Sequence, residues 1–179
     1  MPALDHLASL FYDDMALLGR FEEVGAEVVP EPYRGLLAHH QHMTVAMERH
    51  HGGPVEVQVL ASRRDGDYYS RKIVLRRHSD GQVVLFGIPR LNLQLLDEEV
   101  QRELLAERKP LGRLLIEHNI LREVQLASLY RVQLGPDLAT LFQRPCGETT
   151  YGRTAFLYCD GYLAVELLEI VAPEARFGR

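Results

Sequence analysis

The alternation of apolar and polar side chains predicts a β-hairpin near the end of the chain. Residues 151–159 are rich in aromatic and apolar side chains, and Asp160-Gly161 follows as a strong two-residue turn signal. A second strand then runs over 162–171. We expect the rest of the chain to be organised around this hairpin.

A second group of strands is predicted in the first half of the chain. Valine alternates with polar residues over 55–61, as is typical of a half-buried strand. Short turns join this segment to the next two strands, so the pairing should be antiparallel. The three strands are predicted at 55–61, 68–76 and 82–88, with turns at 63–67 and 78–81 and an end at Pro89.

Helical spacing of apolar residues appears between and before these strands. Runs of strands and runs of helices together predict an α+β fold with a largely antiparallel sheet. Residues 121–131 fit a helix or a strand, and 135–149 are expected to be irregular. Helices are predicted at 3–23 (as one helix or two short ones, broken by the prolines of 28–32), 33–50, 97–108 and 110–118.

Composition limits the function classes. The chain of 179 residues fits one domain, and its net charge of −5 argues against a general nucleic-acid binder. No run of about 18 apolar residues is present, so we expect no membrane span. The start of the chain fits neither a signal nor a transit peptide, and the two cysteines form no CxxC motif. A cytoplasmic protein is expected.

Arg71 is the first candidate for a binding site. Alternation places it with Tyr69, Ile73 and Leu75 on the face predicted to point to the core, while the face of Ser70, Lys72, Val74 and Arg76 should meet solvent. A buried guanidinium without a partner costs about 3–5 kcal/mol. It therefore needs a carboxylate, from the protein or from a ligand, unless it is simply exposed.

Glu169 is the second candidate. Period-two alternation places it with Leu163, Val165, Leu167 and Val171, so it is a carboxylate among apolar side chains. Glu166 lies on the other face with apolar neighbours and could play the same part. Either glutamate could form an internal ion pair with Arg71, or face water at a sheet edge.

The histidines His39, His40, His42, His50 and His51 invite a metal-site interpretation. No pair among them has the i, i+4 spacing typical of a metal-binding helix, although His39 and His42 could meet at i, i+3. We expect surface or capping histidines and no metal.

Motifs for nucleophilic catalysis and for phosphate binding are absent from the sequence: it holds no GxSxG, GxGxxG or GxxxxGK[ST]. Gly112, beside Arg113 at a predicted helix start, is only a weak anion signal. The residues alone thus predict a cofactor-free pocket for a small anionic ligand.

Five motifs, taken together and in order, resemble chorismate pyruvate-lyase, also called 4-hydroxybenzoate synthase, in its shorter, divergent branch. The resemblance covers roughly residues 35–173. The motifs are HMTVAMERHHG (42–52), YYSRKIVL (68–75), KPLGRLL (109–115), YGR (151–153) and ELLEIVAP (166–173).

The resemblance implies an antiparallel sheet with helices that enclose a buried pocket. It also implies cleavage of chorismate to 4-hydroxybenzoate and pyruvate without a metal or an organic cofactor. Arg71 would bind the ring carboxylate and Glu169 would face the 4-hydroxyl. The other residues implied to line the substrate pocket are Met43, Leu111, Gly112 and Arg153.

Three departures from the family pattern concern the substrate more than the fold. His42 stands where serine is usual before Met-Thr, residues 135–149 are irregular, and residues 1–30 form an N-terminal helical extension to a single domain over 1–179. The alternatives are a lyase-like tailoring enzyme for another substrate and a non-catalytic binder of aromatic or sugar acids. Ligand-sensing domains of some bacterial transcription regulators are similar to this fold, but they usually follow a winged-helix DNA-binding segment. Only about thirty residues precede the matching region here, and we expect these to be too few for such a segment.

Overall fold

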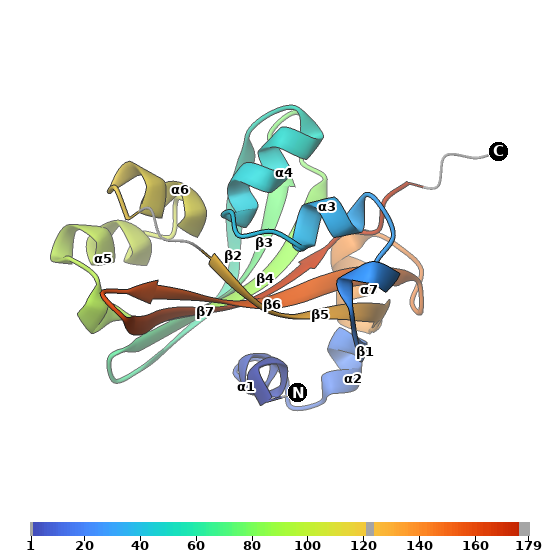
Figure 1. Ribbon diagram of the computed structural model, residues 1–179, viewed down its shortest axis with the longest axis horizontal. Coiled ribbons are helices and arrows are strands. Elements are labelled where there is room, and N and C mark those ends of the chain that lie inside the picture. Colours follow the sequence, from blue (N-terminus) through green and yellow to red (C-terminus); the bar gives the residue numbers. More distant parts are fainter. Residues whose placement is uncertain (1, 121–123, 176–179) are drawn as a thin grey trace.

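A seven-stranded antiparallel sheet forms the centre of the domain, described here from a computed structural model over residues 2–120 and 124–175. The strand order is β1-β5-β6-β7-β4-β3-β2 (Figure 1). The strands are β1 (Gly19–Val24), β2 (Val55–Asp65), β3 (Tyr68–Arg77), β4 (Val83–Asn92), β5 (Val124–Leu134), β6 (Thr149–Cys159) and β7 (Tyr162–Val171). The helices are α1 (Pro2–Ser9), α2 (Met15–Leu18), α3 (Tyr33–Leu37), α4 (Met43–His51), α5 (Glu98–Leu105), α6 (Leu111–Glu117) and α7 (Pro136–Phe142), with short 3-10 turns η1 (Ala26–Val28) and η2 (Leu93–Leu95).

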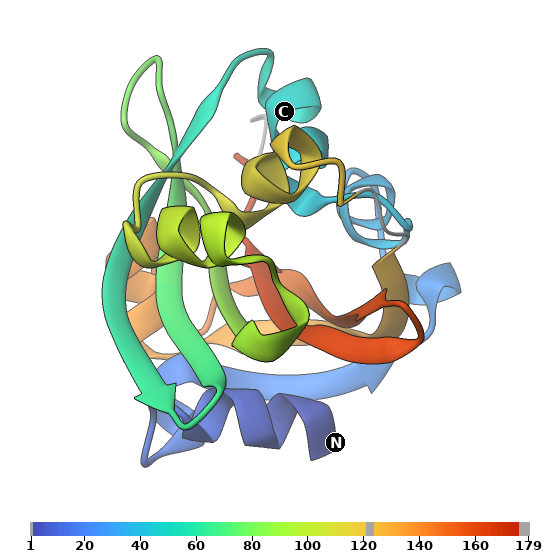
Figure 2. The same cartoon turned by 90° about the vertical axis from the view of Figure 1, so that its left-hand side faces the viewer.

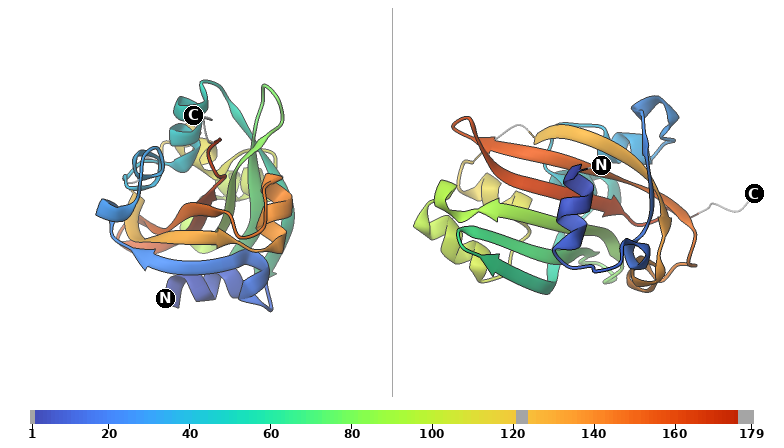
Figure 3. Two further views of the ribbon diagram at one scale, coloured as in Figure 1. Left: turned by 90° about the vertical axis from the view of Figure 1, so that its right-hand side faces the viewer. Right: turned by 90° about the horizontal axis from the view of Figure 1, so that it is seen from below.

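Helices cover both faces of the sheet. The pairs α3–α4 and α5–α6 lie over one face, the upper one in Figure 1, whereas α1 crosses the other (Figures 1 and 3). On the upper face, the α3–α4 and α5–α6 pairs each pack over their own apolar cluster. None of the helices over the described residues is long and apolar enough to cross a membrane.

The terminal hairpin and the three-stranded meander are confirmed. The turn lies at Asp160-Gly161, and β7 pairs with β6 on one side and β4 on the other. The expected face pattern of β7 is also observed, because Val165, Leu167 and Glu169 all border one cavity, described below.

The prediction that Pro89 ends the third strand is wrong. Strand β4 continues to Asn92, and Pro89 pairs with Leu167 of β7. On the β3 side the register joins Ser70 to Arg90 and Ile73 to Gly87, and the ladder skips the positions between them. Because proline has no N–H to donate, this gap lets the strand continue. Arg71 lies at the gap.

The solvent-facing assignment for one side of β3 is also wrong. Val74 is fully buried and Ser70 nearly so, and Val74 belongs to the apolar cluster that holds Leu4 and Leu7 of α1. The alternating pattern could not show that a helix from the start of the chain covers this second face.

The N-terminal thirty residues are not a purely helical extension. Residues 19–24 form the edge strand β1, which pairs with β5, so the expected helix over 3–23 is replaced by two short helices and a strand. Phe21 packs edge-to-face on Tyr130 of β5, an apolar contact that serves a strand as well as a helix.

Four further predicted segments differ from the structure or become defined by it. The expected helix 33–50 is two helices, α3 and α4, and the turn predicted at 63–67 is shorter because β2 continues to Asp65. The ambiguous segment 121–131 contains β5 from Val124, its first three residues lying outside the described part. The irregular segment 135–149 contains α7, which has Pro136 in its first turn.

Candidate functional site

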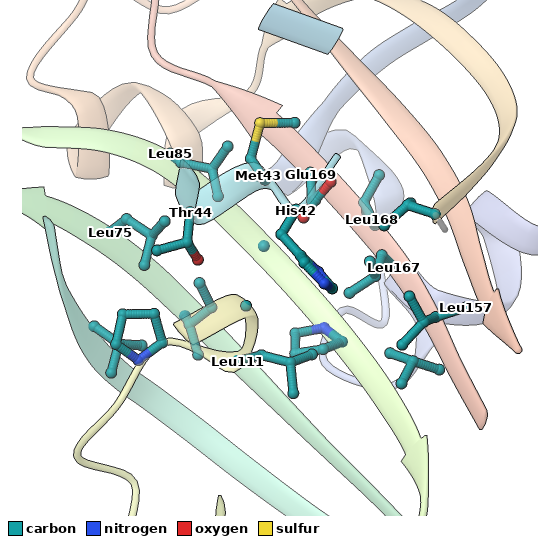
Figure 4. Close-up of a pocket in the computed structure, with 18 of the residues that line it drawn as sticks. His42, Met43, Thr44, Leu75, Leu85, Leu111, Leu157, Leu167, Leu168 and Glu169 are labelled. Carbon is teal, nitrogen blue, oxygen red and sulfur yellow. The ribbon is translucent and has the colours of Figure 1, made fainter. Parts of the chain in front are cut away.

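A cavity lies between the upper face of the sheet and the helices above it (Figure 4). Figure 2 shows α4, α5 and α6 above the sheet. Its empty volume, counted together with the open space at its mouth, is about 600 Å³. Most of its wall is apolar and comes from β3, β4 and β7 below and from α4 and α6 above. All six residues predicted for the site line this cavity: Met43, Arg71, Leu111, Gly112, Arg153 and Glu169.

Arg71 reaches the cavity as a buried cation with two unmatched donors. The residue is 1% exposed, and among the described residues its Nε and Nη1 atoms have no hydrogen-bond partner. Its Nη2 atom donates to the backbone oxygen of Lys109 at 3.3 Å. Burial lowers the pKa of the guanidinium, against the raising effect of Tyr69 and Glu107, but arginine remains charged at neutral pH.

Arg153 and Glu169 form a fully buried ion pair. Arg153 Nε donates to Glu169 Oε2 at 2.7 Å, and the Arg153 side chain is 0% exposed. Its Nη1 and Nη2 atoms donate to the backbone oxygens of Leu37, His39 and Gln41. Arg153 therefore holds Glu169 at the cavity wall and ties the α3–α4 connection to the sheet.

The ion pair of Arg71 with Glu169 or Glu166, one of the alternatives left open by the sequence, is not formed. Glu169 takes Arg153 as its partner, and Glu166 pairs with Arg90 at 2.9 Å, outside the cavity. The sequence did not indicate Arg153 as the partner, because the hairpin contains a bulge between Leu157 and Tyr158 that shifts the register. Only with this shift does Arg153 lie opposite Glu169.

Leu111 and Gly112 begin the roof helix α6, which packs directly on the first turn of α4. A Cβ atom at Gly112 would lie 2.7 Å from Thr44 Oγ1 and 3.1 Å from the Cβ atom of His42. The glycine thus allows the two roof helices to approach closely. Arg113 then pairs with Glu48 across the same contact.

Gly112→Ala should destabilise the domain. Alanine favours a helix over glycine by about 1 kcal/mol, but forcing a methyl group into this contact costs about 1–3 kcal/mol. Urea unfolding should therefore show a lower free energy of unfolding than wild type. Gly53→Ala is the control, since a Cβ atom there meets nothing within 4 Å; equal stability of Gly112→Ala and Gly53→Ala would contradict the tight contact.

The histidine cluster separates into three environments. His39 and His40 bind the backbone oxygens of Leu36 and Val124, which is a structural role. His42 lines the cavity. The remaining two, His50 and His51, lie with Glu174 so that one ligand atom of each falls within 4.8 Å of the others, and none of these three lines the cavity.

Comparisons with known proteins identify the fold. No protein-family model matches the chain, and no curated protein matches its sequence. A similar solved structure is the ligand-binding domain of a protein assigned to the GntR family of transcriptional regulators from Bordetella bronchiseptica. It has a TM-score of 0.52 and 15% identity over 65% of this chain and 85% of that chain.

Two more solved structures are similar in fold. PhnF from Mycobacterium smegmatis has a TM-score of 0.56 and 13% identity, over 73% of this chain and 63% of that chain. The gene product SA0254 of Staphylococcus aureus has a TM-score of 0.51 and 12% identity, over 65% and 83% of the two chains. The predicted α+β fold is confirmed. At these identities the likeness extends to the fold alone.

Proposed function

We propose that this protein is a lyase that cleaves chorismate to 4-hydroxybenzoate and pyruvate. The observation that carries the proposal is Arg71, a buried cation whose Nε and Nη1 atoms lack a partner among the described residues and which borders a cavity. Such a group is costly unless a ligand carboxylate completes it, and the guanidinium fork suits bidentate capture of that carboxylate.

The remaining polar groups suit the substrate. Arg71 would bind the ring carboxylate, and Glu169, held by Arg153, would accept a hydrogen bond from the 4-hydroxyl group. The apolar walls formed by Ile73, Leu75 and Leu167 would pack on the ring. In the reaction the C3–O bond breaks and the enolpyruvyl group leaves with the bonding electrons. C4 loses its hydrogen as a proton, the ring becomes aromatic, and the leaving enolpyruvate takes up one proton to become pyruvate.

The reaction needs positioning more than chemical activation, because aromatisation already makes it downhill. A fixed substrate shape and a dry cavity are therefore the main contributions expected of the protein. The negative charge of Glu169 near C4 would favour departure of the C4 hydrogen as a proton. The same apolar cavity would hold the aromatic product, so slow product release is expected.

The test is to mix the purified protein with chorismate and to measure pyruvate by a coupled assay and 4-hydroxybenzoate by chromatography. We expect both products in equal amounts, and neither with Arg71→Met. Unchanged chorismate over a time in which the spontaneous reaction is accounted for would contradict the lyase proposal.

A second candidate is a non-catalytic binder of a small organic acid, which is favoured by the likeness to a regulator's ligand-binding domain. A lyase-like enzyme for a different substrate is the third. Glu169→Gln separates binder from enzyme, because glutamine keeps an acceptor for Arg153 Nε but loses the charge. An enzyme should lose turnover and keep ligand binding, whereas a binder has no turnover to lose.

A further inference from the structure

His42 presents to the cavity a buried nitrogen that no described residue hydrogen-bonds. Its Nε2 atom is buried and has no hydrogen-bond partner among the described residues. Figure 4 shows the side chain extending from the start of α4 into the cavity toward Leu167. Buried polar atoms are rarely left unmatched, so this nitrogen, like the free donors of Arg71, indicates a ligand group.

The charge of the cavity limits which ligand fits. Two arginines and one glutamate line it, which gives a net charge of +1. A monoanion would be balanced, whereas a dianion would bring one surplus negative charge into an apolar enclosure. Arg153 cannot readily supply the missing charge, since it already serves Glu169 and three backbone oxygens.

Among the described residues that line the cavity, His42 is the one histidine, the side-chain type whose charge most readily changes near neutral pH. Burial lowers its pKa below 6.5, Glu169 acts in the opposite direction, and Arg153 lowers it further. The other charged side chain of the facing sheet is Arg71, from β3. On the roof, Arg113 of α6 pairs with Glu48, and Lys109 pairs with Glu103 and Glu117 outside the cavity.

We propose that His42 binds the second anionic group of the ligand and takes up one proton from solvent when a dianion enters. This inference rests on the proposed function, because chorismate carries two carboxylates. In the free protein His42 is neutral at neutral pH; in the complex the second carboxylate completes an ion pair with the imidazolium. A ligand with a single carboxylate enters without proton uptake.

The affinity for a dianion should depend on pH. Since the complex holds one proton more than its components, affinity for a dianion should fall as pH rises from 6.5 to 8, approaching tenfold per unit. Affinity for a monoanion should stay constant over the same range.

The experiment is isothermal titration calorimetry in two buffers of different ionisation enthalpy, with two stable ligands of one skeleton. These are 3-(carboxymethoxy)benzoate, a dianion that cannot eliminate, and 3-methoxybenzoate, a monoanion. We expect uptake of about one proton with the first and none with the second. His42→Gln and His42→Ser should lose the uptake, and their affinity should fall by at least about tenfold for the dianion and by much less for the monoanion.

His39→Gln is the matched control and should keep the uptake, because both ring nitrogens of His39 already bind the backbone. Melting curves of each variant are needed to check that it is folded. Binding of both ligands by wild type without proton uptake overturns this inference alone, as does uptake retained in both His42 variants. Binding of neither ligand overturns the proposed function as well.

Discussion

Arg71→Met should make the free protein more stable and abolish ligand binding. The substitution removes a buried charge that forms no ion pair with a described carboxylate, although Glu107 acts on it at longer range, and replaces it with an apolar chain of similar length. We expect the free energy of unfolding to rise by about 1–3 kcal/mol. Affinity for 4-hydroxybenzoate should fall at least about 100-fold, since a charged bidentate contact is lost.

Urea unfolding and calorimetry measure these two effects on the same sample. Arg90→Met is the matched control: Arg90 lies on the neighbouring strand and pairs with Glu166 outside the cavity. That variant should lose stability and keep its ligand affinity. Loss of stability in Arg71→Met would mean that the contacts of the guanidinium within the fold, such as its hydrogen bond to the Lys109 backbone oxygen, already compensate for its burial. The argument for a ligand site would then fail.

Arg153→Met should have the opposite effect on stability. It leaves Glu169 buried without a counter-charge and removes the donors to the three backbone oxygens of the α3–α4 connection. Breaking a buried pair in this way costs about 3–5 kcal/mol. For a domain of this size the melting temperature should fall by about 2–4 °C for each kcal/mol.

The double variant Arg153→Met, Glu169→Leu should recover much of that loss, because neither member of this pair is then left buried without the other. Arg131→Met is the control, as Arg131 of the adjacent strand pairs with Glu22 at the surface, where an ion pair contributes about 0–1 kcal/mol. Equal losses in Arg153→Met and Arg131→Met would show that burial of the pair adds nothing.

The sequence predicts the strands of the sheet better than it predicts which residues contact one another. Alternation located β3 and β7 and placed Arg71 and Glu169 on faces that meet at one cavity. Motif resemblance added Met43, Leu111, Gly112 and Arg153 to the same cavity. These positions depend on local pattern, which a single sequence contains.

The partners of those residues depend on long-range geometry. The Asp160-Gly161 turn alone would place Gly152, not Arg153, opposite Glu169, and only the bulge near Leu157 corrects the register. The second cover of the sheet was missed for a similar reason, because no local pattern tells whether α1 returns to bury Val74. The sequence also does not predict that His42 borders the cavity, because the spacing of the histidines bears on metal binding and not on which side chain faces a ligand.

The edge strand β1 also affects the order in which the chain folds. Its partner β5 lies far along the sequence, so that Val24 pairs with Leu129. Closing so long a loop is entropically unfavourable early in folding, whereas the β2–β3 and β6–β7 hairpins close locally. During synthesis β1 leaves the ribosome before β5 and must therefore wait for most of the domain before it can pair. Substitutions in β1 should thus accelerate unfolding and leave the folding rate nearly unchanged.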